Sequence, residues 1–113
     1  FEYDLILQMI NKYGDMVYRV YMLKCADGSL YTGWTTDIPR RLHEHNSGKG
    51  AKYTRSRIPC VLVCCWSCGS TSDALKLEHT IKKLSRKKKI DLIQKSSDLK
   101  KSTMEYIFNG FKR

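Results

Sequence analysis

Two tyrosines, Tyr21 and Tyr31, stand ten residues apart in stretches rich in β-branched and aromatic residues. A phenol hydroxyl can donate or accept a hydrogen bond, and it serves as a base when nearby positive charge lowers its pKa from about 10. The alternative is an ordinary place in a strand, where tyrosine is common. The two residues are therefore candidates for acid–base chemistry if cationic groups lie close to them.

Arg41 and His45 lie one turn apart on a predicted helix, and they flank its apolar stripe of Ile38 and Leu42. An arginine fork matches two phosphoryl oxygens, and a histidine ring can orient or move a proton. A solvated basic helix face is the alternative interpretation. Both side chains are expected at the edge of the buried face.

Glu78 is the only acidic residue between Ala74 and Ile90, in a region full of lysine. Helical spacing puts it at the margin of the core face, where an ion pair with Lys82, four residues on, is one use. Another use is metal binding, because a hard divalent cation that keeps several waters needs only one or two carboxylates plus substrate phosphate oxygens. Both uses of Glu78 stay open.

The elements that hold these residues begin with a predicted β-hairpin. Its strands run from Val17 to Lys24 and from Ser29 to Trp34, and Asp27-Gly28 between them is typical of a two-residue type I′ turn. This turn predicts two cross-strand pairs, Tyr21 with Trp34 and Tyr31 with Lys24.

Further elements follow the hairpin. Pro39 opens a helix that continues through Arg40–His45. The apolar run Cys60–Trp66 is typical of a strand covered on both faces. A second helix is predicted at Asp73–Leu84 and a short third one at Ile90–Ile93. These elements predict an α/β (α+β) domain with a small, mainly antiparallel three-stranded sheet flanked by about three helices.

The chain has 113 residues, and its 21 Lys+Arg against 11 Asp+Glu give a formal net charge of +10. This length predicts one domain, at residues 17–95, with an N-terminal extension at 1–16 and a C-terminal extension at 96–113. The longest apolar run is too short to span a membrane. Five cysteines and no secretory signal pattern favour an intracellular location. The positive charge makes nucleic acid the expected partner.

Residues 46–59 are predicted to form a basic, partly aromatic loop. Such a loop is expected to grip the phosphate backbone rather than to read bases. The second helix adds two lysines to this surface. The predicted nucleic-acid contacts are Lys49, Lys52, Tyr53, Arg55, Arg57, Lys82 and Lys83.

Several motifs together resemble the GIY-YIG endonuclease superfamily, in its small stand-alone single-domain branch. They are DGSLYTG, RRLHEHN, GKGAKYT, and Glu78 followed by IKKLSRKKK. Arg19-Val20-Tyr21 stands where the family has its first triplet and Tyr31-Thr32-Gly33 where it has the second. The order tyrosine, tyrosine, arginine, histidine, glutamate is the specific feature, and the resemblance covers about Val17 to Ile93.

The resemblance implies a Mg²⁺-dependent (or Mn²⁺-dependent) DNA endonuclease that hydrolyses phosphodiester bonds in DNA repair or recombination. Such hydrolysis needs an activated water and stabilisation of charge on the phosphoryl and leaving oxygens. The implied roles are Tyr31 as general base, Arg41 as phosphate clamp, Glu78 as metal ligand, His45 and Tyr21 as orienting groups, and Gly33 as the point of close backbone approach.

Two other classes of function remain open. One is a nucleic-acid-binding domain that keeps the fold without catalysis, and the other is an interaction module for an acidic protein partner. RNA is an alternative substrate, and a targeting partner and the oligomeric state are undetermined. Trp34 occupies a position where other branches often have lysine, and no asparagine occurs between Asn46 and Asn109.

Overall fold

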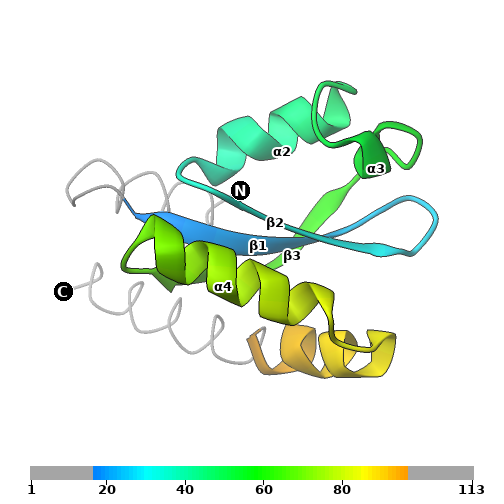
Figure 1. Ribbon diagram of the computed structural model, residues 1–113. Coiled ribbons are helices and arrows are strands. Elements are labelled where there is room, and N and C mark those ends of the chain that lie inside the picture. Colours follow the sequence, from blue (N-terminus) through cyan, green and yellow to red (C-terminus); the bar gives the residue numbers. More distant parts are fainter. Residues whose placement is uncertain (1–16, 97–113) are drawn as a thin grey trace, which may run out of the picture.

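The computed structural model describes residues 17–96 (Figure 1). Its sheet is antiparallel, with the strand order β2-β1-β3. The elements in chain order are β1 (Tyr18–Lys24), β2 (Leu30–Thr35), α2 (Ile38–Asn46), α3 (Lys52–Arg55), β3 (Val61–Cys68) and α4 (Thr71–Lys82). Residues 86–96 are also helical. The predicted α+β fold with a three-stranded antiparallel sheet is confirmed.

The predicted extensions fall almost wholly outside the described residues. None of the helices within residues 17–96 is long and apolar enough to cross a bilayer.

The hairpin turn contains three residues, Ala26 to Gly28, instead of the predicted two. The N–H of Gly28 donates to the carbonyl of Cys25 at 2.9 Å, and the N–H of Cys25 donates to the carbonyl of Ser29 at 2.9 Å. Gly28 has a φ of 83°, a left-handed conformation that glycine adopts readily. The turn is therefore a type I turn closed by a left-handed glycine, which lengthens the loop by one residue.

This longer turn shifts the strand register by one residue. Tyr21 pairs with Gly33 and Tyr31 pairs with Leu23, so the predicted partners of both tyrosines are wrong. Successive strand residues point to opposite faces, and a one-residue shift exchanges the faces. The observed register consequently brings the two tyrosines onto the same face of the sheet.

β3 is an edge strand, and its apolar side chains pack into the clusters on both faces of the sheet, as the apolar run predicts, but most of them are only partly buried. Of its side chains only that of Cys64 is fully enclosed, and Val61 is 54% exposed. The central position belongs to β1, where five consecutive residues from Arg19 to Leu23 are buried. Pairing on both sides of β1, rather than apolar composition, decides which strand is enclosed.

α2 covers the sheet face that carries the tyrosines (Figure 1). Asp37 caps its N-terminus by accepting a hydrogen bond from the N–H of Arg40 at 3.1 Å, and Pro39 occupies the first turn. Ile38 and Leu42 pack against the sheet, as their spacing predicts. The helix thus turns its next positions, Arg41 and His45, towards the same face.

α4 and the helical residues 86–96 cover the opposite face (Figure 1). α4 begins two residues before the predicted Asp73, because Ser70 caps it, and it ends at Lys82 instead of Leu84. Ala74 and Ile81 of α4 are buried against Val20 and Met22 of β1. The last helix is longer than the predicted Ile90–Ile93 segment.

The predicted loop 46–59 contains one helical turn, α3, so the prediction of a continuous loop is wrong there. The N–H of Thr54 donates to the carbonyl of Ala51 at 3.1 Å. Thr54 is completely buried, whereas Lys52, Tyr53 and Arg55 are exposed. α3 therefore directs one polar side chain into the protein and leaves the basic ones in solvent.

Candidate active site

Three rings gather on the α2 face of the sheet. The centroid of the His45 ring lies 5.8 Å from that of Tyr21 and 5.2 Å from that of Tyr31, and the two tyrosine rings are 6.4 Å apart. All three come from positions that the sequence singled out. The structure thus brings together the two tyrosines and the histidine, which lie on three different elements.

Gly33 lies beneath the two tyrosine rings. A Cβ atom at this position would lie 2.6 Å from the hydroxyl oxygen of Tyr21 and 3.2 Å from Cε2 of Tyr31. Real side chains do not approach so closely, and the neighbouring atoms belong to rings that are packed on several sides. Glycine is therefore required here by the tyrosines themselves, in addition to any approach of a substrate.

His45 is fully buried and hydrogen-bonded through both ring nitrogens. Nε2 lies 2.7 Å from the hydroxyl of Tyr21, and Nδ1 lies 2.8 Å from the hydroxyl of Thr54. Burial lowers the pKa of His45 from its ordinary value, and the charge of Arg41 lowers it further. The ring is therefore neutral at pH 7.

Burial also acts on Tyr21, whose pKa rises to about 12. The nearby Arg41 opposes this rise, while the charges of Tyr31 and Glu78 add to it. These influences connect Tyr21 with residues of β2, α2 and α4. Tyr21 consequently keeps its proton at neutral pH and acts as a neutral hydrogen-bonding group.

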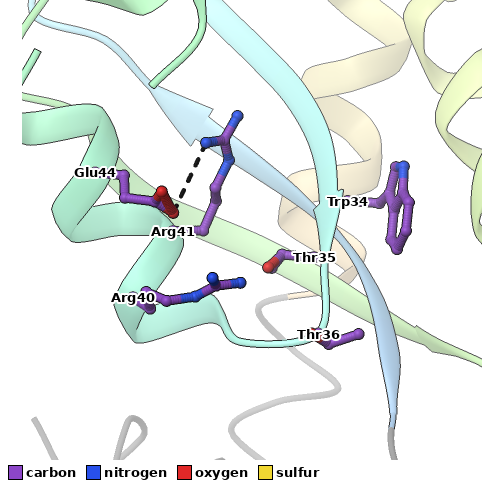
Figure 2. Close-up of a pocket in the computed structure, with 6 residues that line it drawn as sticks. All are labelled: Trp34, Thr35, Thr36, Arg40, Arg41 and Glu44. Atoms are coloured by element: carbon purple, nitrogen blue, oxygen red, sulfur yellow. Dashed lines mark ion pairs between the residues drawn. The ribbon is translucent and has the colours of Figure 1, made fainter. Parts of the chain in front are cut away.

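Arg41 borders a hollow of about 430 Å³ between α2 and the end of β2 (Figure 2). Its guanidinium lies 3.8 Å from the carboxylate of Glu44, and its side chain is 29% exposed. Figure 2 shows Arg40 and Arg41 on the α2 side of the hollow and Trp34 on the other side of β2. The residues that line it are Trp34, Thr35, Thr36, Arg40, Arg41 and Glu44.

A second hollow of about 390 Å³ lies at the other half of β2. It is lined by Leu30, Tyr31, Thr32, Tyr53, Lys82 and Lys89. The first hollow borders residues 34–36 and the second borders residues 30–32, so Gly33 lies between them. Each hollow has two basic side chains, which suits a phosphate backbone that runs along this edge strand of the sheet.

Glu78 reaches this region from α4. Its side chain is 19% exposed, and its carboxylate lies 3.3 Å from Nζ of Lys82, as the spacing of the two residues predicts. Nζ of Lys82 lies 5.8 Å from the centroid of the Tyr31 ring. The carboxylate and the lysine therefore stand beside the tyrosines although α4 covers the opposite face.

The remaining predicted nucleic-acid contacts occupy different environments. Lys49, Lys52, Arg55 and Lys83 are exposed. Tyr53 is 39% exposed, and its ring stacks on that of Tyr31 with centroids 5.9 Å apart.

Arg57 differs from these residues because the protein already holds its guanidinium. Nε lies 3.0 Å from the carboxylate of Asp27, and Nη1 donates to the carbonyl of Tyr53 at 2.7 Å. Its Cζ lies 4.0 Å from the centroid of the Tyr53 ring. The contacts favour a structural use of Arg57, which keeps Tyr53 against Tyr31.

Two residues that contact His45 were not identified as site residues from the sequence. Thr54 hydrogen-bonds the ring, and Gly50 lies so close to it that a Cβ atom there would collide with Nδ1. Both residues belong to the GKGAKYT motif, of which only Lys49, Lys52 and Tyr53 were predicted as site residues. Nothing in the spacing of a threonine nine residues after a histidine indicates that the two meet.

A divalent metal at this site would have few protein ligands. Within residues 17–96, no three His, Cys, Asp or Glu side chains are grouped so as to hold an ion. Mg²⁺ retains several waters and often takes one carboxylate together with substrate phosphates. The partly exposed carboxylate of Glu78, next to the hollow beside Tyr31, fits this kind of binding.

Comparison with known proteins places the sequence in a family. The model of the GIY-YIG catalytic domain matches residues 17–91. A UPF0213 protein of Halalkalibacterium halodurans is 53% identical over 78 residues, which cover 69% of this chain and 83% of the relative. A UPF0213 protein of Syntrophus aciditrophicus is 54% identical over 80 residues, covering 70% of this chain and 92% of the relative.

A solution NMR structure of a UPF0213 protein from Bacillus halodurans is 52% identical to this chain, with a TM-score of 0.47, and covers 70% of this chain and 84% of its own. The family match extends over well over half of the sequence, and the resemblance inferred from the motifs is confirmed. This chain belongs to the GIY-YIG catalytic domain family, together with small UPF0213 proteins.

Proposed function

We propose that this protein is a divalent-metal-dependent endonuclease that hydrolyses phosphodiester bonds in DNA and acts in repair or recombination. A GIY-YIG catalytic domain suggests a nuclease and implies a nucleic-acid substrate. The observation that carries the proposal is that Tyr31, Arg41 and Glu78 all act on one buried hydroxyl, that of Tyr21, which lies next to Gly33, between the parts of β2 that border the two cationic hollows. These groups come from β2, α2 and α4, and phosphodiester hydrolysis needs their combined chemistry.

Tyr31 is proposed as the general base. The Tyr21 hydroxyl is held by the buried His45, and its pKa of about 12 keeps it protonated. Both nitrogens of His45 are engaged, so this ring cannot also take a proton from an attacking water. Tyr31 is half-buried and borders the hollow that also contains Lys82, whose Nζ lies 5.8 Å from the centroid of the Tyr31 ring.

Arg41 is proposed to hold the scissile phosphate. Its planar fork donates two parallel hydrogen bonds to phosphoryl oxygens and stabilises the charge that builds on them. Nucleases of this family typically use a divalent metal, which Glu78 would hold and which would stabilise charge on the leaving oxygen. Tyr21 and His45 orient this arrangement from the protein interior.

Flanking nucleotides are proposed to contact Lys82 and Lys89 on one side and Arg40 on the other. The exposed Lys49, Lys52, Arg55 and Lys83 extend the same positive surface. Replacing Lys52 or Arg55 by alanine should weaken binding equally for all sequences and reduce the slope of log affinity against log salt by about one unit for each phosphate that is no longer neutralised. A changed sequence preference at an unchanged slope contradicts backbone binding.

The main test is Glu78→Gln, which keeps the size of the side chain and removes its charge. With nicked, branched and single-stranded DNA, metal-dependent cleavage should disappear while DNA affinity stays equal or rises, because a negative charge beside the phosphates is removed. Asp73→Asn is the matched control, since it removes an exposed carboxylate from the first turn of the same helix and should leave cleavage intact. Retained metal-dependent cleavage by Glu78→Gln contradicts the assignment.

A nucleic-acid-binding domain without catalysis is the second candidate. The ion pair between Glu78 and Lys82 favours it, since a carboxylate neutralised by lysine is a poorer metal ligand. In that case the wild type binds DNA with the same salt dependence but cuts no DNA of the panel with any divalent metal. The salt series and the metal-dependent assay together therefore separate the two candidates.

A further inference from the structure

A chain of hydrogen bonds runs from the backbone of α3 into the candidate site. The hydroxyl of Thr54 donates to the carbonyl of Ala51 at 2.9 Å and lies 2.8 Å from Nδ1 of His45. Nε2 of His45 lies 2.7 Å from the hydroxyl of Tyr21. Thr54 and His45 are fully buried, so these groups depend on one another for hydrogen bonding.

The carbonyl of Ala51, where this series of hydrogen bonds ends, determines which partner donates in each of them. A carbonyl only accepts, so the single proton of the Thr54 hydroxyl points to Ala51. The threonine oxygen must then accept from His45, which puts a proton on Nδ1. A neutral imidazole has one proton, so Nε2 is an acceptor and the hydroxyl of Tyr21 donates to it.

These donor and acceptor roles determine what the Tyr21 hydroxyl can offer to other groups of the site. Once the Tyr21 hydroxyl has donated its only proton, its oxygen can only accept further hydrogen bonds. Arg41 lies close enough to influence this hydroxyl, and a guanidinium only donates. We propose that Thr54 is a positioning residue, which sets the tautomer of His45 and thereby makes Tyr21 a hydrogen-bond acceptor for Arg41.

The surroundings of Thr54 support a dedicated role. α3 has a single turn, and its backbone holds Thr54 through the carbonyl of Ala51 and the N–H of Arg57 at 3.0 Å. Gly50, just before this turn, leaves room for the His45 ring where any side chain would collide with it. Residues 50–54 therefore pack against the His45 ring and fix both its orientation and the position of its proton.

NMR spectroscopy can determine the tautomer of His45 directly. Long-range ¹H–¹⁵N correlation spectra of ¹⁵N-labelled protein distinguish the protonated ring nitrogen, and the signals of His45 are identified by their disappearance in His45→Gln. The wild type should show the proton on Nδ1 at neutral pH. Thr54→Val, which keeps the shape and removes the hydroxyl, should move it to Nε2, and Thr54→Ser should restore it to Nδ1.

Cleavage provides the second measurement, and this part rests on the proposed function. Thr54→Val should lower kcat about tenfold, the effect of removing one hydrogen bond, with little change in KM. Thr54→Ser should recover most of the activity. Thr80→Val is the matched control, because Thr80 is exposed on α4 and its hydroxyl donates to the carbonyl of Lys76 at 2.9 Å, outside the hydrogen bonds that hold His45.

A wild-type His45 with its proton on Nε2 overturns the inference, and so does a tautomer that Thr54→Val leaves unchanged. The same holds if Thr54→Val moves the tautomer but leaves kcat at the wild-type value. A wild type that cuts no DNA contradicts the proposed endonuclease instead, and the NMR result then decides the tautomer assignment by itself.

Discussion

The two faces of the sheet are built from the same three strands, but they are held together differently. Beneath α4, Val20 and Met22 pack with Ala74 and Ile81, and the contacts are apolar. Beneath α2, the core also contains Tyr21 and Tyr31 together with a fully buried histidine. Apolar packing has no preferred direction, whereas each hydrogen bond of the other face requires a donor and an acceptor in place.

Because of this difference, we expect substitutions on the two faces to have different effects on stability and on cleavage rate. On the α4 face, removing volume should reduce stability and leave the chemistry of each folded molecule unchanged. On the α2 face, removing a single oxygen should reduce the rate and leave the fold intact. The following experiments test this contrast, in order of decreasing effect.

Tyr31→Phe should lower the cleavage rate by about 10²–10⁴, the usual contribution of a positioned general base. The ring and its contacts with Tyr53 and His45 remain, so the free energy of unfolding should hardly change. Single-turnover rates across pH and urea unfolding measure the two effects. If Tyr31→Phe instead cleaves at a near-normal rate, and if the rate of His45→Ala no longer rises with pH, the roles of the two residues are exchanged.

Met22→Ala should lower the free energy of unfolding by about 2–5 kcal/mol, because Met22 is completely buried and the smaller residue leaves a cavity. Cleavage per folded molecule, measured well below the melting temperature, should equal that of the wild type. Urea unfolding and active-site titration provide the two values. A fall in kcat comparable to that of Tyr31→Phe would remove the contrast between the faces.

Gly33→Ala should reduce both stability and rate, since the new methyl group overlaps both tyrosine rings. Overpacking of this kind costs about 1–3 kcal/mol. Gly28→Ala is the control: a Cβ there meets no atom within 4 Å, and the strain comes only from its φ of 83°. Gly28→Ala should therefore lower the free energy of unfolding but keep the wild-type cleavage rate. Normal cleavage by Gly33→Ala would show that the two tyrosine rings move aside without loss of activity.

Stability should fall as the pH drops below about 6.5, because burial and then Arg41 lower the pKa of His45 in the folded protein. Between the folded pKa and 6.5 the unfolded chain binds a proton that the native state does not, so unfolding becomes easier as the pH falls. His45→Gln should reduce this dependence in urea unfolding at several pH values. His79→Gln, at an exposed position of α4, should leave it unchanged; an equal effect of both would argue against the buried histidine as the cause.

Much of the candidate site was predictable because its residues occupy periodic positions. Helical spacing alone placed Arg41 beside the buried stripe of α2 and Glu78 at the margin of α4, whereas His45, predicted at the edge of that stripe, is fully buried. Thr54 was not predictable, since its contact with His45 depends on how α3 folds back against α2. The fold class followed from hairpin, helix and strand patterns, which depend on near neighbours in the chain.

The sequence by itself determined the order of the elements, the positive charge and the residue types available for phosphodiester chemistry. Only the tertiary structure decided that Tyr21 and Tyr31 share one face, because one extra turn residue before Ser29 reverses the facing of β2. It also decided that β1, flanked by strands on both sides, is the enclosed one. The sequence specifies the type of each side chain, but its neighbours on other strands and helices are determined only when the chain folds.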